Sequence, residues 1–286
     1  MKRAVSLSVL TFLIFINFIN SPPAFSLNPH PVDADRVVVQ RDDLTEEARL
    51  KNQLLSELYK NFPKNEIDDI FSDPRLALDE AVFDSVISQC VLPDGTSRRF
   101  LGYLDPDCGI LIPKSVQRGK KFLEENRELL DEVYKKYGVE PEIVTAILRL
   151  ESNFGNYTGK HRVLNTLYTR YVMYSQRREF VAREINYFIK VAKKNNWDIF
   201  EIKGSAWGAF GMAQFIPSSY WYYAVDGNGD GKIDLFELVD ATHSIANYLA
   251  VHGLSENEND KRAAIWAYNR SKAYVNAIMA YARALK

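Results

Sequence analysis

Hydrophobic positions recur with a helical period along most of this 286-residue chain. Thr45 is a predicted helix start. Leu50, Leu54 and Leu58 follow it at intervals of four residues, which places these leucines on one face of a helix. Two shorter helices are expected at residues 66–71 and 76–88. The three helices together predict a small N-terminal helical unit.

The stretch 90–113 interrupts this periodicity, because it contains three prolines and three glycines. Such residues are typical of irregular connections between ordered units. We therefore place a boundary after it. Residues 44–114 form the predicted N-terminal unit with its connection, and residues 115–286 form a larger helical domain.

The larger domain is predicted to begin with one long helix whose apolar face runs through residues 122–137 and which Gly138 ends. The next helix starts at Pro141, a residue that suits the first helical position. Apolar residues at 143–150 cover much of its circumference, so we expect this helix to be buried in the core. Its last turn carries Glu151.

A carboxyl group at the end of a buried helix has an unfavourable environment for its charged form. The helix dipole is negative at that end and apolar neighbours oppose ionisation, so both effects should raise the pKa of Glu151. A carboxyl group that stays protonated near neutral pH can donate its proton to a glycosidic oxygen. The alternative is a surface glutamate that only ends a helix.

Residues 1–26 have the layout of a cleavable secretory signal, with two basic residues, an apolar stretch and a Pro-Pro-Ala-Phe-Ser end. A membrane anchor is the alternative, but four polar residues interrupt the apolar stretch, which falls short of the roughly 20 apolar residues of a spanning helix. Neither cysteine lies near the cleavage site, so no acceptor for a lipid is present there. Residues 27–43 are expected to form an extended arm. An exported, periplasmic and soluble mature protein is predicted.

The net charge, the cysteines and the histidines argue against several classes of function. The net charge of -1, from 36 basic and 37 acidic residues, gives no support for binding nucleic acid. Two cysteines this close in sequence in an exported chain favour a disulfide between Cys90 and Cys108 over a reactive thiol, which would need a nearby base. The four histidines show no zinc-ligand spacing, so zinc protease chemistry is dismissed.

Several segments in one order resemble the lytic murein transglycosylase B family, of the membrane-bound and soluble lytic transglycosylase B type. Glu151 begins an E-S-x-x-G motif like the one around the catalytic glutamate of that family. The other matching segments are 204–220, which resembles G-x-x-G-x-x-Q-F-x-P-S-S-Y, then 244–249, 252–253, 268–271 and Tyr274. The resemblance implies a mainly α, lysozyme-like catalytic domain behind the smaller N-terminal unit.

The resemblance also implies roles for individual residues. Glu151 corresponds to the single catalytic acid/base, and the remaining predicted residues line the substrate groove. Those near the N-acetyl group and the reacting sugar are Ser205 and Gln214, those in the groove walls are Tyr248, Tyr268, Asn269 and Tyr274, and the arginine pair is Arg177 and Arg178. Aromatic faces suit sugar rings. The alternative is that the tyrosines belong to the core and the arginines to a solvated helix start.

Residues 226–237 satisfy the EF-hand calcium template, with oxygen-bearing side chains at alternating positions and glycine at the sharp turn. The predicted ligands are Asp226, Asn228, Asp230, the backbone carbonyl of Lys232, and either Glu237 or Asp240 as the last carboxylate. The family carries such a loop at this place. A calcium ion here is expected to be structural, because acid catalysis of glycosidic cleavage needs no Lewis acid. No cofactor is expected for catalysis.

The resemblance implies cleavage of peptidoglycan strands with formation of 1,6-anhydromuramic ends. Three alternatives stay open: a hydrolytic muramidase, a non-catalytic peptidoglycan-binding protein, and a calcium-binding protein with a vestigial groove. The chain also departs from the family, because residues 254–264 form a short acidic stretch where better-known members carry a β-rich insertion. Substrate length and exo or endo action are therefore not predicted. Tyr103 is left without a role.

Overall fold

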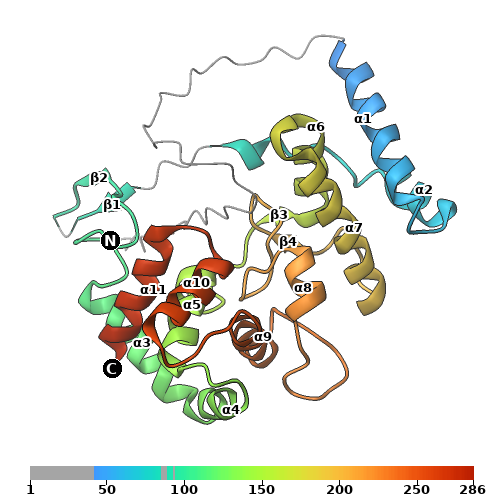
Figure 1. The fold of residues 1–286 in the computed structure, drawn as a ribbon. Coiled ribbons are helices and arrows are strands. Elements are labelled where there is room, and N and C mark those ends of the chain that lie inside the picture. Colours follow the sequence, from blue (N-terminus) through green and yellow to red (C-terminus); the bar gives the residue numbers. More distant parts are fainter. Residues whose placement is uncertain (1–41, 85–88, 93) are drawn as a thin grey trace, which may run out of the picture.

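The computed structural model describes residues 42–84, 89–92 and 94–286. The predicted signal, residues 1–26, lies outside the described residues, as does the arm up to residue 41. No helix in the described part of the chain is long and apolar enough to cross a membrane. The fold is mainly α-helical, with two short two-stranded sheets (Figure 1).

The N-terminal unit has fewer helical residues than predicted. Helices α1 (Asp42–Leu58) and α2 (Lys64–Ser72) are present, and α1 begins three residues before the predicted start at Thr45. The prediction of a helix at residues 76–88 is wrong for residues 76–84, where only a 3-10 turn, η1 (Glu80–Phe83), forms. Residues 85–88 lie outside the described residues. The backbone amide of Asp79 donates to Thr169 Oγ1 at 2.8 Å, so this segment is bonded to the larger domain.

The connection contains a short hairpin that the sequence did not predict. Strands β1 (Gln89–Val91) and β2 (Ser97–Arg99) pair in antiparallel fashion. The predicted disulfide between Cys90 and Cys108 is formed, with the two Cα atoms 5.6 Å apart. Within the loop that it closes, buried Asp105 accepts Arg98 and three backbone N–H groups, which hold the pKa of its carboxyl group well below the usual range.

The single long helix predicted before Gly138 is two helices, α3 (Pro113–Glu125) and α4 (Arg127–Tyr137). The break falls at Asn126, whose side-chain Nδ2 donates to the Phe122 carbonyl at 2.9 Å and competes with helix continuation. Gly138 ends α4 in the left-handed conformation, with φ of 69°. Helix α5 (Pro141–Ser152) follows, and ten of its twelve residues are buried, as predicted.

The helices of the larger domain form two groups (Figure 1). One group lies around α5, and the other forms a second helical layer beside it. Helices α9, α10 and α11 pack with α3, α4 and α5, while α6 and α7 pack together and with α1 and α8. The bounds are β3 (His161–Arg162), α6 (Val163–Met173), η2 (Ser175–Arg177), α7 (Arg178–Asn195), β4 (Lys203–Gly204), α8 (Pro217–Tyr223), α9 (Leu238–Val251), α10 (Glu258–Tyr268) and α11 (Lys272–Leu285).

One continuous hydrophobic core connects the N-terminal unit to the larger domain. It runs from Leu50 and Phe71 to Leu285, and the Phe71 ring packs edge-on against Tyr168 of α6. Surface ion pairs also join the N-terminal unit to the larger domain. Lys193 Nζ lies 2.6 Å from Glu66, and Arg75 lies 2.7 Å from Asp198. The N-terminal unit is therefore fixed against the layer of α6 and α7.

Candidate active site

The end of α5 is built so that Glu151 lies in the core. Asn153 and Phe154 both adopt left-handed conformations, with φ of 52° and 60°, and turn the chain sharply. Ser152 Oγ accepts the Gly155 amide at 2.9 Å. Gly155 has φ of 79°, and a Cβ there would lie 2.8 Å from Met212. The Ser-x-x-Gly part of the motif thus encodes a tight helix end behind Glu151.

Glu151 is buried, with only 4% of its surface exposed. Burial raises the pKa of its carboxyl group to about 8, and a hydrogen bond from Tyr274 opposes this increase. The Tyr274 hydroxyl donates to Glu151 Oε1 at 2.6 Å. The direction of the shift agrees with the sequence prediction. Glu151 is therefore a protonated acid near neutral pH.

Three tyrosines surround this carboxyl group. Tyr268 donates its hydroxyl to the Ala213 carbonyl at 2.6 Å, and the Tyr103 ring lies edge-on to Tyr274 with centroids 6.1 Å apart. The pKa of each tyrosine is raised, first by burial and then by Glu151. All three hydroxyls remain neutral and able to donate hydrogen bonds across the working pH range.

Tyr103 is a residue that the sequence analysis left without a role. It lies in the loop closed by Cys90 and Cys108, and the backbone carbonyl of Tyr103 accepts the Ile110 amide at 2.8 Å. The predicted disulfide is the one sequence feature that could have indicated a role for Tyr103, because a cross-linked loop holds its side chains in place. The missing information was where the loop packs in the fold.

The facing wall comes from the glycine-rich segment 204–220. Gln214 has an unusual φ of 47° and donates its side-chain Nε2 to the carbonyls of Thr158 and Gly211, at 2.9 and 2.8 Å. Its amide orientation is therefore fixed. Ser205 Oγ accepts the amides of Trp207 and Ala209 at 3.3 and 3.2 Å, which leaves its own proton free to donate.

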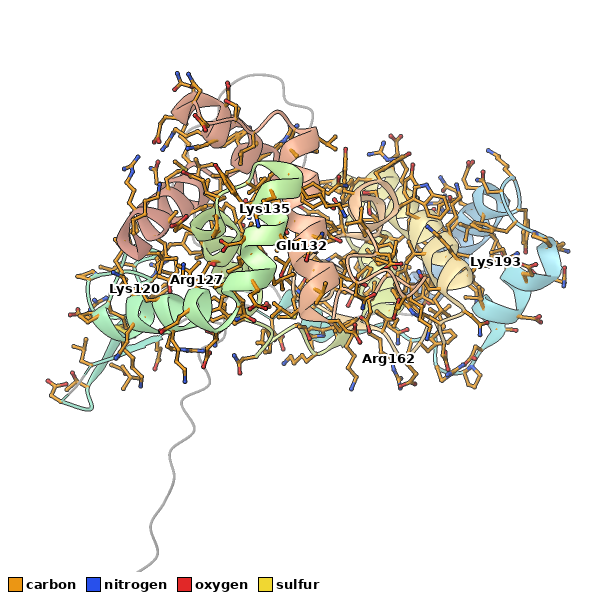
Figure 2. All side chains as sticks on the ribbon, turned by 90° about the horizontal axis from the view of Figure 1, so that it is seen from below. Lys120, Arg127, Glu132, Lys135, Arg162 and Lys193 are labelled. Atoms are coloured by element: carbon orange, nitrogen blue, oxygen red, sulfur yellow. A yellow bond between two sulfur atoms is a disulfide. The ribbon has the colours of Figure 1, made fainter. Side chains whose placement is uncertain are left out.

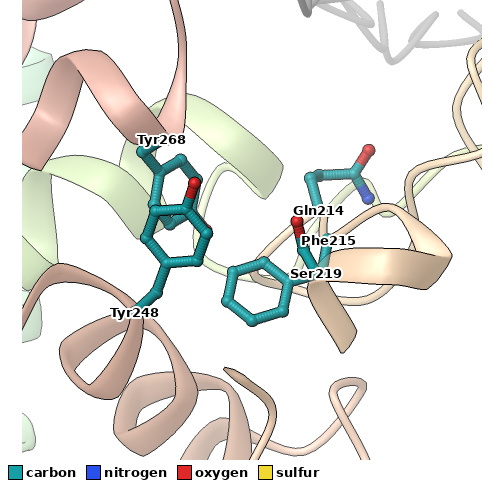
Figure 3. Close-up of a pocket in the computed structure, with 5 residues that line it drawn as sticks. All are labelled: Gln214, Phe215, Ser219, Tyr248 and Tyr268. Carbon is teal, nitrogen blue, oxygen red and sulfur yellow. The ribbon is translucent and has the colours of Figure 1, made fainter. Parts of the chain in front are cut away.

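A small pocket lies between these walls, with Tyr248 and Tyr268 on one side and Gln214 and Ser219 on the other (Figure 3). Phe215 lies at its base, and its ring centroid is 5.7 Å from both tyrosine rings. The Tyr248 hydroxyl donates to the Ala267 carbonyl at 2.8 Å. The structure thus brings Gln214, Tyr248 and Tyr268 together, and it adds Ser219, which the sequence analysis did not single out.

Asn269 follows Tyr268 at the end of α10 and is buried. Among the residues that the structure describes, neither its side-chain oxygen nor its nitrogen has a hydrogen-bond partner. A buried amide without partners is costly unless a ligand or water supplies them. Asn269 is therefore well suited to bind a polar group of a ligand.

The two predicted groove arginines do not join this cluster equally. Arg178 turns back onto the end of α6, where its guanidinium donates to the carbonyls of Tyr171 and Val172 at 2.9 and 3.3 Å. The guanidinium of Arg177 lies 6.0 Å from the Trp207 ring, in the same glycine-rich segment as Ser205. Of the pair, Arg177 lies nearer the wall of the site.

Another buried carboxyl group has a raised pKa, but it binds the start of helix α8 and not the site around Glu151. Burial raises the pKa of Glu184, on α7, to about 7. Its two oxygens accept the backbone amide and hydroxyl of Ser218 at 2.9 and 2.8 Å, so it caps the start of α8. No other carboxyl group in the described ranges contributes to the pKa of Glu151.

The loop at 226–237 is held closed by its own backbone amides. Asp226 accepts Gly229 and Gly231 at 2.6 and 2.8 Å, and Asp230 accepts Lys232 at 2.8 Å. These are oxygen donors of the type that calcium prefers. However, no three acidic, histidine or cysteine side chains of the described residues converge closely enough to hold an ion.

The two candidates for the last carboxylate differ in environment. Asp240 is buried, and its two oxygens accept the amides of Gly227 and Asp234 at 2.8 and 2.6 Å. Glu237 is exposed, and its Oε2 lies 3.5 Å from Asn228 Nδ2. Asp240 therefore links the loop to α9, whereas the carboxylate of Glu237 lies at the surface with one long hydrogen bond from Asn228.

The fold is that of solved lytic transglycosylases. Residues 48–263 match the family model of the transglycosylase SLT domain, so the chain belongs to this family. It is 38% identical over 161 residues to the membrane-bound lytic murein transglycosylase B of Escherichia coli. That match covers 56% of this chain and 44% of the relative, less than half of the relative's length.

Two solved structures show the same fold at lower identity. The Escherichia coli lytic transglycosylase SLT35 in complex with calcium has a TM-score of 0.68 at 24% identity, covering 84% of this chain and 92% of that one. SltB3 from Pseudomonas aeruginosa in complex with NAG-anhNAM-pentapeptide has a TM-score of 0.67 at 23% identity, covering 85% and 79%. The predicted lysozyme-like fold is thereby confirmed.

Proposed function

We propose that this protein is a lytic transglycosylase that cleaves the β-1,4 bond between N-acetylmuramic acid and N-acetylglucosamine in peptidoglycan, with formation of 1,6-anhydromuramic ends. The observation that carries the proposal is the buried Glu151, with a pKa of about 8 and an orienting hydrogen bond from Tyr274. Family membership and the peptidoglycan fragment bound in SltB3 support the substrate class.

In the first step, protonated Glu151 donates its proton to the glycosidic oxygen as the bond to C1 of the muramic sugar breaks. Tyr274 occupies Oε1 with its hydrogen bond, so the proton is carried on Oε2. The N-acetyl group of the same sugar stabilises the positive charge at C1. In this proposal the side-chain oxygen of Gln214, whose Nε2 is already bonded, and the amide of Asn269 hydrogen-bond that group and neighbouring hydroxyls.

In the second step, the Glu151 carboxylate takes the proton from the C6 hydroxyl while O6 forms the new bond to C1. The glutamate returns to its protonated form, and no water is consumed. One carboxyl group serves both steps, whereas hydrolysis normally requires two. Tyr248, Tyr268 and Tyr103 supply aromatic faces around the sugars. Arg177 and Ser205 extend the groove wall, and Arg178 supports it through α6.

Isotope labelling tests the reaction type. Digestion of purified sacculi in water enriched in oxygen-18 should give soluble fragments without the label at C1, because O6 rather than water attacks that carbon. A hydrolytic muramidase would instead introduce one labelled oxygen for each bond cleaved. Labelled reducing ends would overturn the proposal.

The loop at 226–237 is proposed to bind a structural calcium ion, with oxygens from Asp226, Asn228, Asp230 and the Lys232 carbonyl and a final carboxylate from Glu237 or from Asp240 in the first turn of α9. The donor types and the calcium complex of SLT35 support this. The loop follows directly on α8, so a bound ion would brace the wall that contains Gln214. Export to the periplasm, where the substrate lies, fits the signal-like residues 1–26.

A further inference from the structure

A second pocket lies at the seam between the N-terminal unit and the β3–β4 hairpin. It has a volume of about 350 Å³, within the range typical of small-ligand sites. Its polar lining consists of Asp79, Lys160, His161, Arg162, Asn165 and Lys203. None of these residues belongs to the cluster around Glu151.

The acceptor side of this pocket is rigid. Asp79 Oδ2 lies 2.6 Å from Nδ1 of the buried His161, and Asn165 Nδ2 donates to the Arg75 carbonyl at 3.0 Å. Asn165 is 7% exposed, and its Oδ1 has no hydrogen-bond partner among the residues described. The Asp79 carboxylate and the Asn165 side-chain oxygen can therefore accept hydrogen bonds from a ligand donor, such as an ammonium group.

The donor side carries three cationic side chains, and only Arg162 has an acidic partner among the residues described. Within the described residues, neither Lys160 nor Lys203 forms an ion pair, and both are exposed. Arg162 lies 3.8 Å from Glu201, a contact too long to be a good hydrogen bond. A ligand carboxylate would gain charge-assisted hydrogen bonds from these side chains. With acceptors on the other side, the pocket complements a zwitterion better than a simple anion.

The pocket adjoins the proposed glycan site through the same hairpin. Lys203 lies two residues before Ser205, and Lys160 lies two residues after Thr158, whose carbonyl holds Gln214. Two residues of a strand span about 7 Å. The third residue of an extended peptide lies about 10 Å from its attachment point. On each side of the hairpin, the pocket is therefore two residues along the chain from a residue of the proposed groove wall or its support.

We infer that this pocket binds the zwitterionic amino-acid head of the peptidoglycan stem peptide. The head is the second carboxylate and ammonium of a diamino dicarboxylic acid at its third position. The carboxylate contacts Lys160, Arg162 and Lys203, and the ammonium contacts Asp79 and Asn165. The inference rests on the proposed function for its substrate class. It goes further by assigning a peptide subsite outside the glycan groove.

Calorimetric titration with a free stem tetrapeptide tests this subsite, because the peptide contains no glycosidic bond and its binding does not depend on cleavage. The peptide carrying meso-diaminopimelate should bind saturably. The matched peptide carrying lysine lacks the second carboxylate, which contacts Lys160, Arg162 and Lys203 in this proposal, and should bind at least about tenfold more weakly. Equal affinity for the two peptides, or no saturable binding of the first, would overturn the inference.

Variants locate the binding in the pocket. Lys160→Ala with Lys203→Ala should weaken binding of the diaminopimelate peptide by tenfold or more. Lys120→Ala should not, because Lys120 is an exposed lysine on α3 and lies well apart from Arg162 (Figure 2). Matching melting temperatures would show that all variants fold. If the double variant binds like the wild type, the pocket is not the subsite, whatever products the enzyme makes from sacculi.

Discussion

Glu151 has its raised pKa because α5 ends inside the core rather than at the surface. The sequence predicts both the buried helix and the direction of the shift, since apolar residues surround the turn that carries the glutamate. It does not predict the hydrogen bond from Tyr274, because the two residues are 123 positions apart. Only the packing of α11 against α5 brings them together.

This buried acid should cost the folded state stability as the pH rises. Below the usual glutamate pKa the carboxyl group is protonated in both states, so there is no cost. Between that value and about 8 the unfolded state ionises while the folded state does not, and stability falls. Glu151→Gln should therefore increase the free energy of unfolding at pH 7 by about 3 kcal/mol, and the melting temperature should rise with it.

The stability difference between Glu151→Gln and the wild type should vanish near pH 4. Thermal melts from pH 4 to pH 8 measure it directly. Gln keeps an oxygen that can accept the Tyr274 hydroxyl, so the comparison isolates the ionisable proton. A difference that does not depend on pH would show that Glu151 does not have a raised pKa in the folded protein.

Removal of the Tyr274 hydroxyl should shift the pH profile of the enzyme. The hydrogen bond stabilises the charged form of Glu151 and so lowers its pKa from the value that burial alone would give. In Tyr274→Phe the alkaline limb of kcat/KM should move to higher pH. The wild-type limb should lie near pH 8. A shift to lower pH would contradict this role.

At the scale of elements, the sequence predicts helices better than their interruptions. The apolar periodicity continues across Asn126, so α3 and α4 read as one helix although one residue separates them. The segment after α2 reads as helical but is held by Thr169 and His161 of the larger domain. Such long-range bonds leave no local pattern in the sequence.

The loop at 226–237 is the element whose stability should respond to calcium. An ion that binds only the folded protein adds stability in proportion to the logarithm of its concentration over Kd. Saturating calcium should therefore raise the melting temperature by roughly 5 °C or more. The double variant Asp226→Asn with Asp230→Asn should lose this response. It keeps one side-chain oxygen at each position, which retains the bond to Lys232 and one of the two amide bonds of Asp226.

Chelation should lower the melting temperature before it affects cleavage at 25 °C, because calcium takes no part in the proposed chemistry. Magnesium serves as the matched control, since it demands a smaller and more regular oxygen shell. Loss of activity on chelation without any change in melting would contradict a structural role for the loop.

At the scale of the whole molecule, the disulfide and the core join parts that the sequence separates. The sequence predicts the bond between Cys90 and Cys108 but not that its loop delivers Tyr103 to Tyr274. The predicted boundary after residue 114 stays a prediction. One core runs through both sides of it, from Leu50 to Leu285.

Loss of this disulfide should affect both stability and catalysis. Replacing Cys90 and Cys108 by serine should lower the unfolding free energy by about 3 kcal/mol, the value for a loop of this length. It should also lower kcat/KM, because Tyr103 is no longer held beside the acid. Tyr103→Ala separates the two effects, since it should lower kcat/KM with a smaller change in melting temperature. Unchanged kcat/KM in both variants would remove Tyr103 from the site.

Mass spectrometry of the fragments released from purified sacculi tests most directly whether Glu151 drives transglycosylation. The protein should release fragments with 1,6-anhydromuramic ends, one water lighter than the hydrolysis products. Glu151→Gln should release at least a hundredfold less of the same material, because it cannot supply the proton. Fragments with reducing ends, or comparable anhydro products from the Glu151→Gln variant, would contradict the proposed reaction and its catalytic residue.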